Sequence, residues 1–83
     1  KGSYMDYGMF IQSIMLSAVE HGLATCPQAA LGEYPDIVRQ EFPEYKDKLV
    51  LCGLALGYED KDHIVNSYRT PRENLSRFVN FYS

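Results

Sequence analysis

Main-chain donors beside small side chains occur in residues 25–30, Thr-Cys-Pro-Gln-Ala-Ala. Pro27 carries no amide hydrogen, so the free N–H groups of Gln28, Ala29 and Ala30 can face one side of the turn. Side chains as small as alanine would let a planar ligand come close to those donors. From these residues alone, the stretch is either a ligand-binding turn or an ordinary loop after a helix, and the loop is the simpler interpretation.

A pair of arginines forms the second candidate site. Arg69 and Arg72 flank Thr70 and Pro71 near the end of the chain. Two guanidinium groups around a proline-stiffened turn can bind a phosphate through bidentate hydrogen bonds. The competing interpretation is a pair of solvated surface arginines, which are common in proteins.

The usual catalytic and metal-binding motifs are missing from the sequence. It contains no Gly-Xaa-Ser-Xaa-Gly elbow, no Gly-rich phosphate loop with lysine, and no CxxC or HExxH pattern. The two histidines, His21 and His63, match no metal-ligand spacing, so we interpret them as a helix-end residue and a loop residue. The sequence therefore predicts no catalytic side chain and no metal ligand.

Composition and charge narrow the class of protein. The 83 residues allow one domain at most, and the net charge of −3 gives no electrostatic basis for binding nucleic acid or an anionic membrane. No apolar run approaches the roughly 20 residues that span a bilayer. The two cysteines, Cys26 and Cys52, form no disulfide-dense pattern, which is typical of a reduced, cytoplasmic protein.

The longest predicted element is a helix over about residues 6–21. Its apolar residues cover most of the helix circumference, so we expect protein to surround it on most sides. Asp6 suits the N-cap, and Gly22 stands where a helix commonly ends in a left-handed residue. The rest of the chain holds little other helix, so most neighbours of this long buried helix must come from elsewhere.

A shorter helix and one strand follow. The amphipathic pattern of residues 34–42 predicts a helix with Pro35 in its first turn, ended by Pro43. Residues 49–58 form an uncharged apolar run, which is typical of a central strand covered on both faces. No other strand is predicted, and a lone strand leaves its main chain unpaired. We therefore expect residues or chains outside this sequence to complete the sheet.

The C-terminal tail is expected to dock on a partner. Leu75, Phe78, Val79 and Tyr82 follow a helical spacing, which predicts a short terminal helix. Extended packing across another subunit would bury the same side chains. Together, these elements predict an α+β fold in which residues 1–83 are part of a single domain.

In order and spacing, these features resemble the C-terminal part of the FMN-dependent nitroreductase family. The resemblance covers essentially the whole chain. It rests on four stretches, which are residues 6–12 leading into the apolar helix, residues 20–28, residues 51–58, and Val65-Asn66 followed by residues 70–72.

The resemblance implies a homodimeric α+β flavoenzyme. Members of the family take hydride from NADH or NADPH onto FMN and pass it through flavin N5 to nitroaromatics or quinones, so the chemistry is mostly the cofactor's. The resemblance also implies that Ala29 or Ala30 donates its N–H to N5. The residues that it assigns to the cofactor are Pro27, Gln28, Ala29 and Ala30 along the flavin, and Arg72 and Arg69 at the FMN phosphate.

Length is where the chain departs from the family. Family members carry an N-terminal half with further flavin contacts and most of the sheet, and a start at Lys1 without an initiator Met also indicates a piece of a longer product. We therefore expect that a homodimer or a complementary N-terminal half is needed, and that the isolated chain binds FMN weakly and lacks reductase activity. Two alternatives stay open: a flavoprotein of the same fold with another substrate, such as a dehalogenase, and a non-enzymatic interaction module without flavin.

Overall fold

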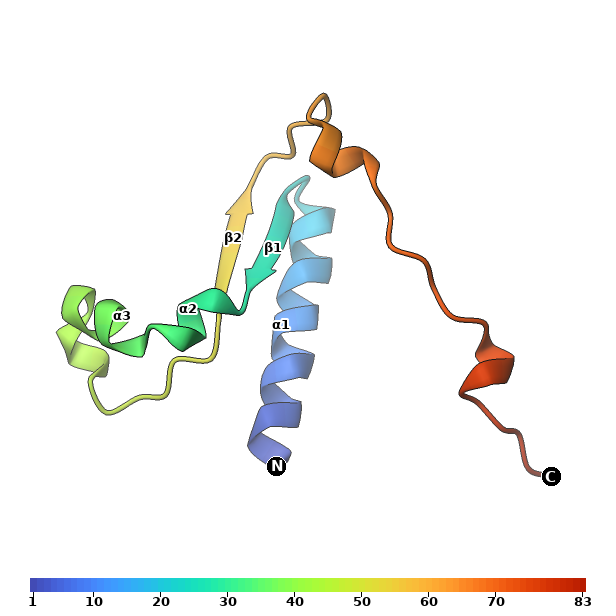
Figure 1. Ribbon diagram of the computed structural model, residues 1–83, viewed down its shortest axis with the longest axis horizontal. Coiled ribbons are helices and arrows are strands. Elements are labelled where there is room, and N and C mark those ends of the chain that lie inside the picture. Colours follow the sequence, from blue (N-terminus) through green and yellow to red (C-terminus); the bar gives the residue numbers. More distant parts are fainter.

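The computed structural model describes residues 1–83 as one long helix, a two-stranded sheet and several short helical segments (Figure 1). The predicted α+β class is confirmed. In chain order the elements are α1 (Gly2–Glu20), β1 (Ala24–Gln28), α2 (Ala30–Glu33), α3 (Pro35–Glu41), the 3-10 turn η1 (Pro43–Tyr45), β2 (Gly53–Gly57), and the 3-10 turns η2 (Ile64–Ser67) and η3 (Leu75–Arg77).

A hydrogen-bonded cap around Gly22 ends α1. Gly22 has a φ of +73°, its N–H donates to the Val19 carbonyl at 3.0 Å, and the Leu23 N–H donates to the Ala18 carbonyl at 2.9 Å. These two bonds form the Schellman pattern, which satisfies carbonyl groups that a helix end otherwise leaves free. The predicted left-handed ending at Gly22 is confirmed, and it turns the chain so that β1 runs beside α1 (Figure 1).

The start of α1 differs from the prediction. The helix begins at Gly2, with Lys1 at the N-cap position, so the expected cap Asp6 lies inside the helix. No side chain caps this end, and the Met5 N–H already donates to the Lys1 carbonyl at 3.2 Å. A capping side chain favours the start of a helix but is not required for it. The predicted start at Asp6 was therefore several residues too late.

β1 and β2 form an antiparallel pair, with Ala24 opposite Gly57 and Gln28 opposite Gly53. The prediction of a single strand with all its partners outside the chain is therefore wrong for one edge of β2, and the residues expected to be a loop form β1. Small residues and Pro27 give β1 no strand pattern in the sequence. The proline is tolerated because β1 pairs on one side only.

β2 is shorter than the strand predicted for residues 49–58. β1 ends at Gln28 and the chain turns into α2, so residues 49–52 have no strand to pair with. The apolar run therefore continues beyond the sheet as irregular chain. Its composition predicted the strand correctly but could not predict where the partner strand would stop.

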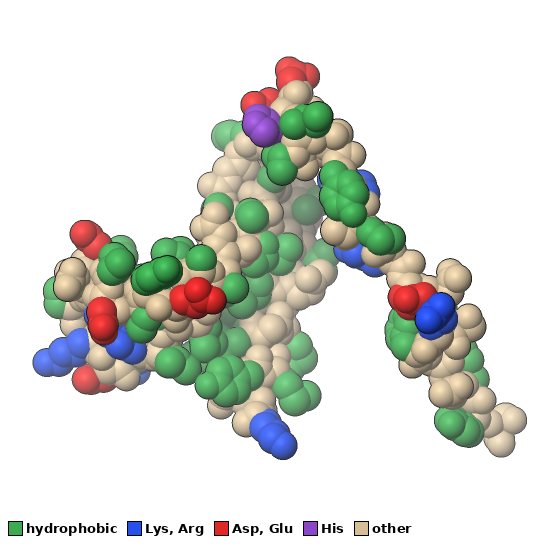
Figure 2. Space-filling view, in the orientation of Figure 1, with side chains coloured by type: hydrophobic (Ala, Val, Ile, Leu, Met, Phe, Trp, Pro, Cys, Tyr) green, Lys and Arg blue, Asp and Glu red, His purple; other side chains and the backbone are tan.

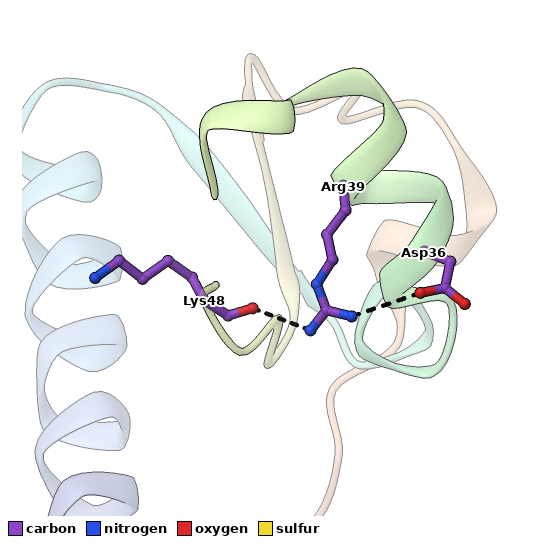
Figure 3. A network of polar contacts seen from close by, with 3 residues as sticks. All are labelled: Asp36, Arg39 and Lys48. Carbon is purple, nitrogen blue, oxygen red and sulfur yellow. Dashed lines mark hydrogen bonds and ion pairs between the residues drawn. The ribbon is translucent and has the colours of Figure 1, made fainter. Parts of the chain in front are cut away.

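The helix predicted for residues 34–42 is confirmed as α3, with Pro35 in its first turn beside Asp36. Arg39 ties this helix to the connection that leads toward β2 (Figure 3). Its Nη2 donates to the Lys48 carbonyl at 3.0 Å, and its Nη1 lies 3.5 Å from the Asp36 carboxylate. The guanidinium group thus links α3 to the irregular segment that contains Lys48.

The C-terminal tail runs away from the sheet as an extended arm (Figure 1). Of the helix predicted through Tyr82, only the single turn η3 forms, so the extended alternative describes the tail. Phe81 and Tyr82 are 87% and 91% exposed. Because isolated helices shorter than about 12 residues are marginal in water, a tail without a packing surface has little reason to coil.

Apolar side chains remain exposed over most of the chain (Figure 2). Ala18 is the one buried residue, and Phe10 in the middle of α1 is 62% exposed. The chain exposes 7932 Å², whereas a folded monomer of 9.5 kDa exposes about 5,000 Å². Its radius of gyration is 16.8 Å, against about 12 Å for a compact chain of this length. These 83 residues therefore do not enclose a core by themselves.

Despite its apolar character, α1 does not meet the length and hydropathy needed to cross a bilayer, and neither does any other helix.

Gly22 and Gly8 offer a matched pair of substitutions that test the α1 cap. A Cβ at either position meets no atom within 4 Å, so new packing contributes to neither change. Gly22→Ala should lower the free energy of unfolding by about 1 kcal/mol, because alanine disfavours the left-handed region. Gly8→Ala, inside α1, should raise it by about 0.5–1 kcal/mol. Urea unfolding of the gene product that carries this chain measures both, and unchanged stability in Gly22→Ala would contradict the cap.

Candidate functional site

The main-chain donors predicted at residues 28–30, which we call the donor turn, lie where β1 leads into α2. Gln28 is the last residue of β1, Ala30 is the first residue of α2, and Ala29 joins them in a right-handed conformation with φ −63° and ψ −28°. The Ala29 carbonyl accepts from the Gly32 N–H at 2.9 Å, but the Ala29 N–H donates to no backbone acceptor in the chain. Because the side chains of Gln28 to Ala30 are exposed, a ligand can reach this unpartnered donor.

Arg69 lies toward the opposite end of the strand pair. It lines an open hollow of about 450 Å³ together with the start of β1, the end of β2 and Asn66. Its Nη1 donates to the Asn66 carbonyl at 3.4 Å, and the Asn66 side-chain amide donates to the Asp60 carbonyl at 2.7 Å. Three residue steps, roughly 10 Å, separate Cys26 at the near edge of this hollow from Ala29 in the donor turn.

Arg72 is placed differently from Arg69. It lies on the extended tail, where its Nη1 donates to the Thr70 hydroxyl at 2.7 Å and to the Pro71 carbonyl at 3.4 Å. It does not line the hollow that contains Arg69. Within this chain, the structure brings Arg69 to the strand pair and leaves Arg72 outside it.

The four arginines divide into two classes by their partners. Arg39 pairs with Asp36, and Arg77 lies 3.4 Å from the Glu73 carboxylate. Arg69 and Arg72 pair with no carboxylate of this chain. An unpaired guanidinium group keeps its full charge available for an anion, and its fork of donors suits a phosphate.

The two histidines have structural roles. His21 Nδ1 lies 2.9 Å from the Ser17 carbonyl at the end of α1. His63 Nδ1 accepts a hydrogen bond from the Val65 N–H at 3.2 Å and so caps η2. Neither imidazole lies at the donor turn or in the Arg69 hollow.

Asn66 is a site residue to which the sequence assigned no role. Its carbonyl accepts from Arg69, and its side chain holds the loop that leads from β2. The available signal was the Val65-Asn66 pair, one of the stretches that carry the family resemblance. The sequence shows where this pair stands, but not that Asn66 would turn its carbonyl toward Arg69.

These features define the chemistry that the strand pair can support. One end offers a main-chain N–H beside small side chains. The other offers the Arg69 guanidinium group, which forms no ion pair although Glu59 and Asp60 also line its hollow. A planar molecule that carries an anionic group could use both donors. No side chain at either end is arranged with a second one as an acid/base pair.

Comparison with known proteins decides the family. A sequence profile described as "Nitroreductase family" matches residues 1–58. The chain belongs to the nitroreductase family.

Nitroreductases of known name match nearly the whole chain. It is 38% identical over 81 residues to a 4-nitrobenzoate reductase of Pseudomonas putida, covering 98% of this chain and 36% of that protein. It is 43% identical over 76 residues to the nitroreductase NfnB of Mycolicibacterium smegmatis, covering 92% of this chain and 32% of that protein. The chain therefore spans about a third of the length of the relatives that it matches.

Solved structures of nitroreductases share the fold of the chain. The FMN-dependent nitroreductase NfnB from Mycobacterium smegmatis, in complex with NADPH, superposes with a TM-score of 0.91 at 39% identity, covering 96% of this chain and 36% of that one. The FMN and NADPH-dependent nitroreductase NfnB from sphigopyxis sp. strain HMH superposes with a TM-score of 0.90 at 38% identity, covering 98% of this chain and 36% of that one. The chain therefore has the fold of part of a nitroreductase.

Proposed function

We propose that this chain is the C-terminal part of an FMN-dependent nitroreductase that uses NAD(P)H to reduce nitroaromatic or quinone acceptors. The observation that carries the proposal is the unpartnered N–H of Ala29 at one end of β1 and the unpaired guanidinium of Arg69 near the other. The family membership supports it, as do the FMN and NADPH in the description of the M. smegmatis structure.

The residues present fit FMN, which joins a planar ring system to a phosphate. When bound, FMN supplies hydride transfer from NAD(P)H to the acceptor, through its N5. Pro27, Gln28, Ala29 and Ala30 would line the ring system, where the compact side chains of Pro27, Ala29 and Ala30 leave room for a planar face. Arg69, joined by Arg72 from the tail, would hold the phosphate.

Ala29 and Ala30 are the two candidate donors of the turn. The N–H of each donates to no backbone acceptor of this chain, and a donor that faces a reacting atom stabilises the negative charge that develops there. We assign the role to Ala29, which directly follows β1. The turn is fixed by β1 before it and by the Gly32 to Ala29 hydrogen bond after it. A donor held in this way needs no rearrangement during the reaction.

The exposed apolar side chains identify the partners that the chain requires. Phe10, Leu16 and Val19 on α1 and Phe81 on the tail are more than half exposed, and leaving such side chains in water costs free energy. We place α1 against the remainder of the nitroreductase domain and the tail against a second subunit of a homodimer. Two free cysteines and the use of NAD(P)H are consistent with a cytoplasmic enzyme.

The absorbance spectrum of the purified gene product that carries this chain tests the proposal directly. It should show flavin bands, and the protein should oxidise NADPH when 4-nitrobenzoate is added. Residues 1–83 alone should bind FMN weakly and show no measurable reductase activity, because they expose the surfaces that the rest of the domain would cover.

A colourless, inactive gene product would contradict the proposal and favour an interaction module. A yellow protein that reduces only halogenated substrates would favour a dehalogenase.

Ala29→Pro removes the proposed donor without straining the backbone. Its φ of −63° already matches proline, and the preceding Gln28 is in a strand, which proline favours before it. Loss of one hydrogen bond, which contributes about 0.5–1.5 kcal/mol, should weaken FMN binding by about 2- to 12-fold. Reduction of the bound flavin by NADPH should slow as well. Ala29→Ser keeps the N–H and should retain most of the affinity. Equal FMN dissociation constants for the proline and serine variants would exclude this N–H as the donor.

Arg69→Ala and Arg72→Ala test the phosphate site, with Arg77→Ala as the matched control. Each of the first two should raise the FMN dissociation constant by about 10- to 100-fold, since a charge-assisted hydrogen bond contributes about 1.5–3 kcal/mol. Riboflavin, which lacks the phosphate, should bind wild type and variants alike. Arg77 is paired with Glu73, so its removal should change FMN binding less than about twofold. A similar loss in all three variants would point to a general charge effect.

A further inference from the structure

Two glycines, Gly32 and Gly53, let α2 pack directly against the main chain of residues 50 and 51, which precede β2. A Cβ on Gly32 would lie 2.9 Å from the Leu51 carbonyl carbon, closer still to its oxygen, and 3.4 Å from the Val50 carbonyl oxygen. The obstacle is backbone, which cannot rotate out of the way as a side chain can. Gly32 therefore allows a close approach of two main chains that no other residue permits.

Gly53 makes the reciprocal contact. A Cβ there would overlap Leu31 Cδ1 and lie 3.2 Å from Leu31 Cγ. Leu31 belongs to α2 and Gly53 is the first residue of β2, so each segment presents a glycine to the other. The obstacle at Gly53 is the end of a flexible side chain, so a Cβ there can be accommodated more easily than a Cβ at Gly32.

This contact sets the conformation of the donor turn. Gln28, just before the turn, is opposite Gly53 in the strand register, and Gly32, just after the turn, packs on Leu51. The Gly32 N–H also donates to the Ala29 carbonyl at 2.9 Å. The Ala29 carbonyl shares its peptide plane with the Ala30 N–H, so this bond orients that peptide, while the Ala29 N–H lies in the preceding peptide, which begins at Gln28 of β1.

We propose that Gly32 is a positioning residue for flavin binding: by letting α2 close on the Leu51 main chain, it holds the donor turn, with the N–H groups of Ala29 and Ala30, in place beside the flavin. The inference rests on the proposed function. Helix propensity alone predicts that Gly32→Ala stabilises the protein, because alanine is favoured over glycine inside a helix and Gly32 has no left-handed φ. A cost of Gly32→Ala to the flavin site can therefore come only from the displaced contact.

The test uses the gene product that carries this chain, with FMN as the probe. Gly32→Ala should weaken FMN binding by about tenfold or more and shift both the flavin absorbance bands and the midpoint potential of the bound flavin. Gly8→Ala is the matched control, since Gly8 also lies inside a helix, belongs to neither end of the candidate site, and a Cβ there meets nothing within 4 Å. It should leave affinity, spectrum and potential unchanged within about twofold.

Gly53→Ala provides a second variant in case Gly32→Ala does not fold. Its smaller loss of FMN affinity should be recovered in the double variant Gly53→Ala/Leu31→Ala, which removes the overlapping side chain. Failure of that recovery would overturn the inference, as would a folded Gly32→Ala protein with wild-type affinity, spectrum and potential. Wild-type protein without FMN would instead overturn the proposed function and this inference with it, so the two failures are distinguishable.

Discussion

Pairing of β1 with β2 is the interaction on which the candidate site depends. The register sets Ala24 opposite Gly57 and Gln28 opposite Gly53, which gives β1 a defined length and direction along its partner. The donor turn and the arginine hollow lie at the two ends of that strand, so their spacing follows from the pairing. A flexible loop of the same residues could supply the same groups, but it would lose more conformational entropy when a ligand bound to them.

The exposed surface of the chain shows how little apolar area these residues bury by themselves. α1 is apolar around most of its circumference, yet only Ala18 is buried within these residues. The chain also spans about a third of its relatives' length. Main-chain pairing and the Gly22 cap define its local geometry, whereas hydrophobic burial, the dominant favourable term in folding, has to come mostly from contacts beyond residues 1–83.

Local signals made some features predictable and long-range contacts hid others. Gly22 and Pro35 act within one helical turn, so the end of α1 and the start of α3 followed from the sequence. β1 did not, because Pro27 and small residues lack strand propensity and the strand exists only through its pairing with β2. At the site, residue type marked the donor turn and the arginines as candidates. The packing of Gly32 on Leu51 depends on residues far apart in sequence and left no local pattern.

A crystal structure of the gene product with FMN bound would show whether the strand pair holds the flavin. The Ala29 amide nitrogen should lie about 3 Å from flavin N5, within hydrogen-bonding distance. The phosphate should contact the Arg69 guanidinium, with β1 paired to β2 as seen in this chain. A flavin bound elsewhere, or a donor turn that faces away from N5 while a residue outside the turn donates to it, would rule out this site.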